Sequence, residues 1–385
     1  MAYAYSRSIT IDGTRVLEPL SNFPVFIGLT NTSFALTSNG GRVQNSNGYD
    51  IAYYSDKSLS SQLAHESEVW KANTGQIAHW VKLPTVSASS NTIFYVAYGD
   101  SGISVSQENT SSANGVWTNN FRAVYHMHIS GNQLNSSGIG AIGLTASSTP
   151  APQYNQSGQC GSASFFASGA SWCYQQNLSY SPFGSTAVHV TLTAWWKWSG
   201  KTGSLGNIAE VNQNGNYRNT IYIYTGPSGS IGGAASMHVP FFHTSQDPSY
   251  ENAVPGIRPH TRGLLTASQW CFIAGVGSGS TFRYCYYGNG TDDFILTGTG
   301  SSTSVTPGIL AGTTIAYADE TGRYQSTGSI DEVRFVTGAR SLNWLRTEYW
   351  NQYSPGTFFT LGGESGAPGT VVYYTTYNPI FFAGD

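Results

Sequence analysis

The sequence predicts an all-β protein built from two β-sandwich domains, with one short helix near the C-terminus. Aromatic residues make up 14% of the 385 residues and Gly occupies 45 positions, whereas charged residues make up only 10%. This composition favours strands joined by many turns, with aromatic side chains at half-buried positions. Short alternating or apolar runs also recur along the chain, separated by turn signals such as SNGG, NSNG and ANTG.

Residues 1–103 are expected to form the first sandwich. Its strand candidates are SRSITID, FPVFIGL, DIAYYS, HWVKLP and TIFYVAYGD. The polar stretch SGISVSQENTSSANG follows, and residues 104–115 within it are interpreted as a linker.

Residues 116–363 are expected to form the second sandwich. Its strand candidates are FRAVYHMH, SASFFA, HVTLTAWWKWS, GNIAEVN, NTIYIYTG, MHVPFFH, WCFIAGVG, TFRYCYYG, TIAYAD and SIDEVRFVTG. This number of strands predicts two large antiparallel sheets packed face to face. The helix candidate is SLNWLRTEYWNQ, in which Ser341 can serve as N-cap and Leu342, Leu345 and Tyr349 share one face.

Residues 364–385 are interpreted as a linker followed by a β-prone tail, VVYYTTYNPIFF. An aromatic strand outside a sandwich usually pairs with something. Either this tail pairs with another copy and makes a homo-oligomer, or it lies back on its own domain.

The overall charge excludes some classes of partner. The net charge of −3 gives no electrostatic reason to expect nucleic acid, and no apolar stretch approaches the 18 residues of a membrane span. The N-terminus begins a strand pattern almost at once and lacks the apolar core of a secretory signal peptide. Either a signal has been removed, or the protein leaves the cell by another route, as a virion protein released by lysis would.

Four cysteines leave the redox state open. Around a GSGS turn, Cys271 and Cys285 face one another if the loop is residues 277–279, so that a cross-strand disulfide is geometrically allowed. Two buried thiols are the alternative. Cys160 and Cys173 could pair in the same way across GSASFFASGASW.

Two stretches resemble known families. YSRSITID, NFPVFIGL, GYDIAYYSD, HESEVWKANTGQIAHWVKLP and NTIFYVAYGD resemble the domain of unknown function 2341, which implies a β-sandwich accessory module with no known chemistry. FRAVYHMH, VTLTAWWKW, WCFIAGV and GSIDEVRFVTGARSLNWLRTEYWNQYSPGTFFTLGG resemble the laminin G-like, concanavalin A-like lectin/glucanase domains. The second resemblance implies a jelly roll, and the poorly matching stretches 129–185 and 225–268 look like enlarged loops.

Asp331 and Glu332 stand side by side in SIDEVRF and raise the question of catalysis. Glucanases of this family carry a Glu-x-Asp strand, and this chain contains no Glu-x-Asp. Neighbours on a regular strand point to opposite faces, so that Glu332 and Arg334 would share one face, with Arg340 as a further partner. Asp331 would share the other face with core residues and would bind backbone N–H groups or a cation. These residues are therefore interpreted as structural.

Metal and glycan sites are weaker candidates. Calcium prefers oxygen ligands, which acidic turn residues offer if they are not simply solvated: Asp292, Asp293, Asp319 and Glu320. His126 and His128 would share a strand face suited to zinc, but without a third ligand they are interpreted as ordinary core or surface residues. Glycans need aromatic faces and amide groups, and the candidates, which could equally be core residues, are Trp196, Trp198, Tyr217 and Tyr250.

These considerations favour a non-catalytic surface or structural protein that acts in adhesion, decoration or assembly. A virion-surface or extracellular location, glycan or surface-protein partners and possible calcium binding belong to this hypothesis. The alternative is a secreted glycoside hydrolase or a polysaccharide-binding accessory module.

Overall fold

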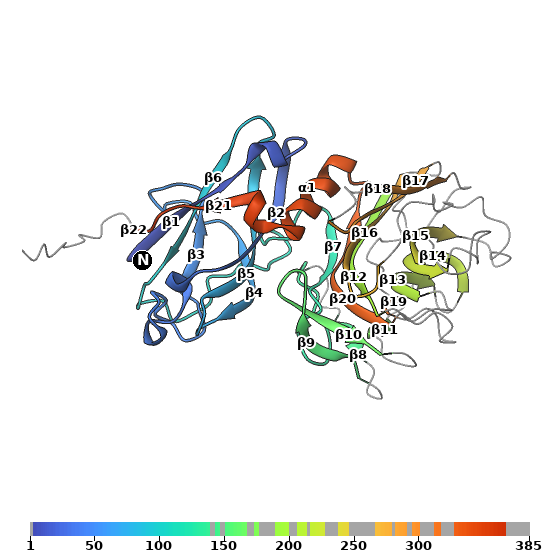
Figure 1. The fold of residues 1–385 in the computed structure, drawn as a ribbon, viewed down its shortest axis with the longest axis horizontal. Helices are drawn as coiled ribbons and strands as arrows, with labels where there is room; N and C mark the ends of the chain where they lie inside the picture. The colour runs from blue at the N-terminus through green and yellow to red at the C-terminus, as the bar shows by residue number, and fades with distance from the viewer. Residues whose placement is uncertain are drawn as a thin grey trace, which may run out of the picture.

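The computed structural model describes residues 3–138, 143–146, 151–167, 173–176, 189–199, 206–213, 216–227, 238–245, 266–278, 282–290, 295–300, 312–316 and 327–366. Strands dominate the fold, at 49%, and two α-helices are present among the described residues. The strands form antiparallel sheets in two sandwich-like units (Figure 1). The all-β class predicted from the sequence is confirmed.

The N-terminal unit packs a five-stranded sheet against a three-stranded one. The larger sheet has the order β21 (Phe359–Leu361), β1 (Tyr5–Ile11), β6 (Thr92–Tyr98) and β3 (Ile51–Tyr54), with β22 (Ser365–Gly366) also paired to β1. The smaller sheet has the order β2 (Leu20–Thr30), β5 (Gln76–Val86) and β4 (His65–Lys71). Three 3-10 turns lie between these strands, at Gly13–Arg15, Thr32–Phe34 and Thr37–Asn39.

The end of the described chain completes this N-terminal unit. Ile9 pairs with Leu361 and Ile11 with Phe359, so that β21 lies beside β1 on the side opposite β6. In Figure 1 the two red strands β21 and β22 lie against the blue β1. Residues 359–361, which the sequence assigned to the second sandwich, are therefore strand partners of the first.

The second unit contains an eight-stranded and a six-stranded sheet. The eight-stranded sheet has the order β18 (Ile295–Gly300), β17 (Phe282–Gly288), β16 (Trp270–Ser278), β12 (His189–Trp198), β20 (Gly328–Thr337), β10 (Ser162–Phe166) and β9 (Gln153–Ser157), with β7 (Phe121–Tyr125) also paired to β20. The six-stranded sheet has the order β15 (His238–Ser245), β14 (Asn216–Pro227), β13 (Gly206–Gln213), β19 (Gly312–Ile315), β11 (Cys173–Gln176) and β8 (Thr145–Ala146).

The eight-stranded sheet is buried on both faces where the units meet. Trp196 and Ile330 belong to the core inside the second sandwich. Trp195 and Phe272 belong to a different core, which continues into the N-terminal unit. Both neighbouring tryptophans of β12 are at most 1% exposed, because each face of this central strand has a packing partner.

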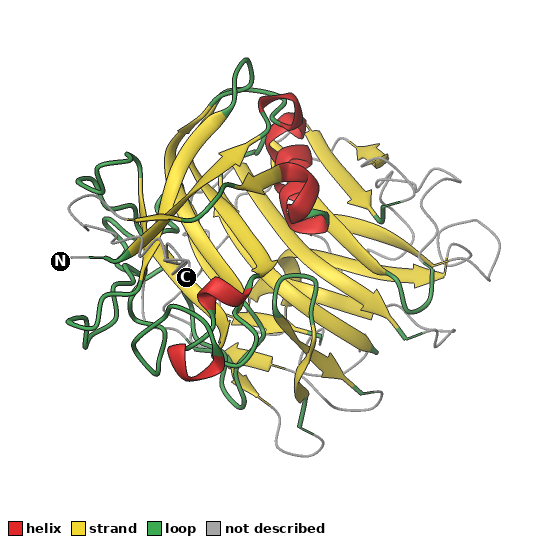
Figure 2. Ribbon diagram, turned by 60° about the vertical axis from the view of Figure 1, so that its left-hand side comes forward, coloured by secondary structure: helices red, strands yellow, loops and turns green. Residues whose placement is uncertain are grey.

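Helix α1 (Leu342–Tyr353) lies between the two units (Figures 1 and 2). The Ser341 hydroxyl accepts a hydrogen bond from Trp344 N, which confirms the predicted N-cap. Leu345 and Tyr349 are buried on the predicted apolar face. Asn351 forms paired hydrogen bonds with the backbone of Phe26 in β2, at 2.7 and 2.9 Å, which fixes the helix on the first unit. A second, four-residue helix α2 (Pro355–Phe358) leads into β21.

The strand register corrects the expected disulfides. Cys285 stands opposite Gly275 and Cys271 opposite Trp196, so that the two thiols do not face one another. The reason is that β16 and β17 pair four residues out of the predicted register. Cys160 is a buried free thiol whose Sγ lies 3.7 Å from Gln352 Oε1, which excludes the expected bond to Cys173.

Candidate functional site

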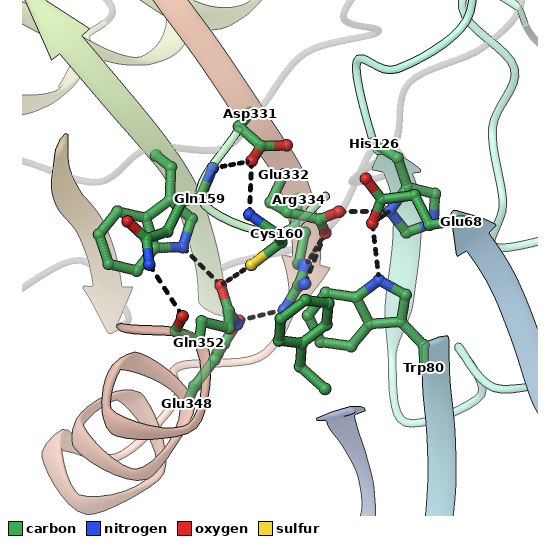
Figure 3. A network of polar contacts seen from close by, with 12 residues as sticks. Glu68, Trp80, His126, Gln159, Cys160, Asp331, Glu332, Arg334, Glu348 and Gln352 are labelled. Atoms are coloured by element: carbon green, nitrogen blue, oxygen red, sulfur yellow. Dashed lines mark hydrogen bonds and ion pairs between the residues drawn. The ribbon is translucent and has the colours of Figure 1, made fainter. Parts of the chain in front are cut away.

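The chemically richest described cluster lies where the two units meet. It combines β4 and β5 of the first unit with β20, α1 and the residues after β7 of the second (Figure 3). Five carboxyl groups gather there, and each belongs to a residue at most 8% exposed: Glu66, Glu68, Asp331, Glu332 and Glu348. Their partners are a guanidinium, an imidazole and two indoles. We call this set, with those partners, the junction cluster.

A β-bulge in β20 creates the carboxylate side of the cluster. Trp195 pairs with Asp331 and Thr193 with Arg334, so that the two intervening residues of β20 stand opposite one residue of β12. Glu332 takes a left-handed conformation there, with φ of 51°. The bulge brings Asp331, Glu332 and Arg334 to the junction side.

The expected strict alternation of this strand is therefore wrong. Val333 and Phe335 lie in the core of the second sandwich, but Asp331 does not share their face. Its Oδ2 accepts hydrogen bonds from the backbone N–H groups of Gln159 and Cys160, at 2.8 and 2.9 Å. The expectation that backbone N–H groups would satisfy a buried Asp331 is confirmed.

Arg334 is the central cation. It donates to Glu332 Oε2 from Nε at 3.2 Å and from Nη2 at 2.6 Å, and its Nη1 donates to Glu348 Oε1 at 2.5 Å. Its guanidinium also lies 4.3 Å from the ring centre of Trp80 and 4.8 Å from that of Trp117. The expected Glu332–Arg334 interaction is confirmed.

Arg340 does not join this group, contrary to expectation. Its guanidinium lies 4.0 Å from the ring centre of Trp344 and donates to the backbone oxygen of Asn119. Arg340 lies beyond the end of β20 at Thr337, where its guanidinium also lies 5.2 Å from the ring centre of Phe121.

His126 connects the carboxylates of the two units. Its Nδ1 lies 2.5 Å from Glu332 Oε1 and 3.9 Å from Glu68 Oε2, and its Nε2 lies 3.4 Å from Glu66 Oε1. Burial alone would lower the pKa of His126, but the charges of Glu332 and Glu66 raise it well above 6.5. His126 is a core residue, as expected.

His128 lies beside His126, with ring centroids 5.8 Å apart. Burial and the neighbouring imidazolium lower the pKa of His128 to about 4. It is therefore neutral while His126 carries charge.

The carboxyl groups divide into ionised and neutral forms. Burial raises the pKa of Glu332, but the charges of His126 and Arg334 outweigh it and lower that pKa to about 2. The pKa of Glu66 is lowered as well, against its burial, by His126. Burial and repulsion from Glu332 raise the pKa values of Glu68 and Asp331 well above their ordinary range.

Indole N–H groups orient the two acids of the first unit. Trp117 Nε1 donates to Glu66 Oε2 at 2.6 Å, and Trp80 Nε1 donates to Glu68 Oε2 at 3.3 Å. Glu68 Oε1 also accepts from the backbone N–H of Ser162, at 3.3 Å, and so reaches across to the second unit. Each acid is thereby held in one orientation.

Chemically, the cluster can hold a charged side chain or a cation at a fixed position from which solvent is excluded. The ligand atoms of Glu68, His126 and Glu332 all lie within 4.8 Å of one another. Because these side chains are buried, a polysaccharide cannot reach them in this conformation.

The other predicted sites have different outcomes. Trp196 is 1% exposed in the core, so its assignment to glycan binding is wrong. Trp198 is half-buried against the same core. The six other candidates lie outside the described residues or have undescribed side chains: Tyr217, Tyr250, Asp292, Asp293, Asp319 and Glu320.

Sequence reasoning missed three acids of the junction cluster. Strand β4 was not recognised, because HESEVWK alternates acidic and small residues instead of apolar ones. Its Glu66 and Glu68 are nevertheless the inward residues. The available signal was the accumulation of acids in a chain with only 10% charged residues. Glu348 of α1 was not singled out either.

No family model matches the chain, and no curated protein matches it. Distant solved structures do. A Trypanosoma rangeli sialidase in complex with 2,3-difluorosialic acid is 9% identical, with a TM-score of 0.40, and the match covers 63% of this chain and 34% of the sialidase. An arabinofuranosidase complexed with arabinofuranosyl-α-1,2-xylobiose is 12% identical, with a TM-score of 0.38 and coverage of 60% and 52%.

Tailspike protein 2 from Escherichia coli O157:H7 bacteriophage CAB120 is 9% identical, with a TM-score of 0.35 and coverage of 50% and 24%. The chain thus spans about half or less of the length of each of these proteins. Such low scores carry no functional argument. Within the described part of the chain, no helix combines the length and hydropathy needed to cross a bilayer.

Proposed function

We propose that this protein is a non-catalytic β-sandwich scaffold that acts in adhesion, decoration or assembly on a virion or extracellular surface. The observation that carries the proposal is the junction cluster. It joins β4 and β5 of one sandwich to β20 of the other through buried charges. Buried ion pairs contribute little net stability over apolar packing, but they fix the relative position of the groups that form them. A fixed arrangement of two sandwiches suits a structural role.

The burial and the contacts of the acidic side chains support the same proposal. Hydrolysis of a glycosidic bond requires two carboxyl groups that both reach the substrate. Asp331 and Glu332, the pair that first suggested chemistry, are 0% exposed and are bound to backbone N–H groups, His126 and Arg334. Their contacts hold the fold together.

Glycan binding is the finer part of the proposal, and it has a candidate surface in the described residues. Trp270 is half-buried, with Lys197 Nζ 4.9 Å from its ring centre. Tyr353, 36% exposed, lies against Gly290, just beyond the end of β17, and the Gln269 amide before β16 donates to the neighbouring Asn289 backbone oxygen. Aromatic rings with amide and ammonium groups are the chemistry that binds sugar faces and hydroxyls.

A glycan array and a reducing-sugar assay on the same polysaccharides test the two parts. We expect binding without sugar release, and Trp270→Ala and Tyr353→Ala should weaken the binding. Leu134→Ala, at a residue 68% exposed, is the matched surface control and should leave it unchanged. Catalytic release of reducing sugar would overturn the non-catalytic role and favour the glycoside hydrolase alternative. Binding unaffected by both aromatic substitutions would remove the proposed surface.

A further inference from the structure

The junction cluster contains more buried acid than its arginine balances. Arg334 pairs with two of the five carboxyl groups, Glu332 and Glu348. Buried carboxylates are paired with cations, coordinate metals or take up protons. Glu66, Glu68 and Glu332 share His126 as their nearest further cation, and a metal ion held between Glu68, His126 and Glu332 would take over that role.

Three side chains offer ligand atoms for a metal ion. Glu68 comes from β4, His126 follows β7, and Glu332 lies at the bulge of β20, with ligand atoms within 4.8 Å of one another. We propose that Glu68, His126 and Glu332 form a binding site for a divalent transition-metal ion, for which zinc is the best fit. Zinc accepts imidazole nitrogen and carboxylate oxygen at about 2.0–2.2 Å, whereas calcium requires six to eight oxygen ligands.

The groups behind the three ligands have the arrangement found around protein-bound metals. A metal-binding histidine usually directs its second ring nitrogen to a carboxylate. Nε2 of His126 lies 3.4 Å from Glu66 Oε1 and forms no hydrogen bond of its own, and Trp117 holds Glu66 in place at 2.6 Å. Trp80 donates to Glu68 and Arg334 donates to Glu332 Oε2, so each carboxylate is oriented as well.

A further buried oxygen near these residues lacks a partner, but it lies outside the group of ligand atoms that are within 4.8 Å of one another. Asp331 Oδ1 has no hydrogen-bond partner although the residue is 0% exposed. Figure 3 shows this oxygen on the side of Asp331 that faces Glu68 and His126, whereas Oδ2 is bound to the backbone. Structural zinc sites typically have four protein ligands, so Asp331 would have to move towards the other three residues to complete a tetrahedral site.

One contact must open for the ion to enter. His126 Nδ1 and Glu332 Oε1 are 2.5 Å apart, whereas two ligands of a tetrahedral zinc ion lie about 3.3 Å apart. Binding therefore separates these atoms by less than about 1 Å, and the ion takes the place of the hydrogen between them.

Metal analysis of the full chain tests the site. The protein is treated with EDTA, incubated with zinc alone and desalted, and its zinc content and thermal midpoint are then measured. We expect about one zinc ion per chain and a higher midpoint with zinc than with EDTA. Cobalt in place of zinc should give the visible absorption of a tetrahedral site.

Three substitutions locate the ion. Glu68→Gln keeps the acceptor for Trp80 and the volume of the side chain, so the protein should fold, but zinc affinity should fall at least about 100-fold because a ligand charge is lost. Glu66→Gln, behind His126, should weaken affinity by about 10- to 100-fold. Glu364 is a partly exposed acid that pairs with Arg42 and is not part of the junction cluster. Glu364→Gln should therefore bind zinc as the wild-type protein does. Folded wild-type protein without stoichiometric zinc would overturn the proposal, as would equal zinc binding by Glu68→Gln.

Discussion

Removal of the buried cation is the most direct test of the junction cluster. Arg334→Met keeps much of the aliphatic volume but removes the guanidinium that bonds Glu332 and Glu348. Loss of one partner from a buried ion pair costs about 3–5 kcal/mol, because the remaining charges stay buried without compensation. For cooperative units of 150–250 residues, that cost corresponds to a fall of about 6–20 °C in the thermal midpoint.

Arg42→Met is the matched control. Arg42 also forms an ion pair, with Glu364 at 3.5 Å, but its side chain is 46% exposed. Exposed pairs contribute about 0–1 kcal/mol, so this variant should unfold within a few degrees of the wild type. Both variants are compared by calorimetry and by urea unfolding at neutral pH. A loss below about 1 kcal/mol for Arg334→Met would refute the view that these charges hold the two units together.

Three further predictions concern other parts of the fold. A chain that ends after Ser354 should lose several kcal/mol of unfolding free energy, because two Phe side chains buried against the N-terminal unit are removed with β21. A chain that ends after Gly366 keeps β21 and should keep its stability. If the second truncation leaves the mass of the oligomer in solution unchanged, assembly through the tail is contradicted. Burial and the nearby charge of His65 lower the pKa of His79 to about 3. Because the unfolded chain takes up a proton at about pH 6.5 and the folded chain does not, the stability present above pH 6.5 is lost as the pH falls, by about 2 kcal/mol at pH 5. His79→Gln should therefore flatten the pH dependence of urea unfolding below pH 6.5, and His189→Gln, at an exposed position, should not. Trp196→Ala should lower the unfolding free energy by about 3–5 kcal/mol, because this side chain is fully buried, and Trp198→Ala should lower it by less. Equal losses would contradict the argument from burial.

Much of the fold was predictable because most strands and α1 carry a local signal. Strand β2 alternates and runs apolar, and α1 has both its Ser341 cap and its apolar face in sequence. Each of these features depends on residues within one or two turns of the chain. The all-β class therefore followed from local patterns and composition.

The junction cluster was not predictable for two physical reasons. The bulge at Glu332 depends on pairing with β12, about 140 residues away, and it reverses the side on which Asp331 lies. Strand β4 is buried through indole hydrogen bonds and ion pairs, so its Glu66 and Glu68 lack the apolar pattern by which a buried strand is recognised. The predicted register of β16 and β17 was likewise wrong by four residues, so that Cys285 pairs with Gly275 and not with Cys271.

The pairing of β1 with β21 has a consequence for how the protein is made. Strand β1 is translated before its partner β21, which follows only about 350 residues later. During synthesis, one edge of β1 therefore has no native neighbour while the whole second sandwich is translated. The N-terminal unit therefore cannot reach its final form, and keeps an exposed strand edge, until β21 has been translated.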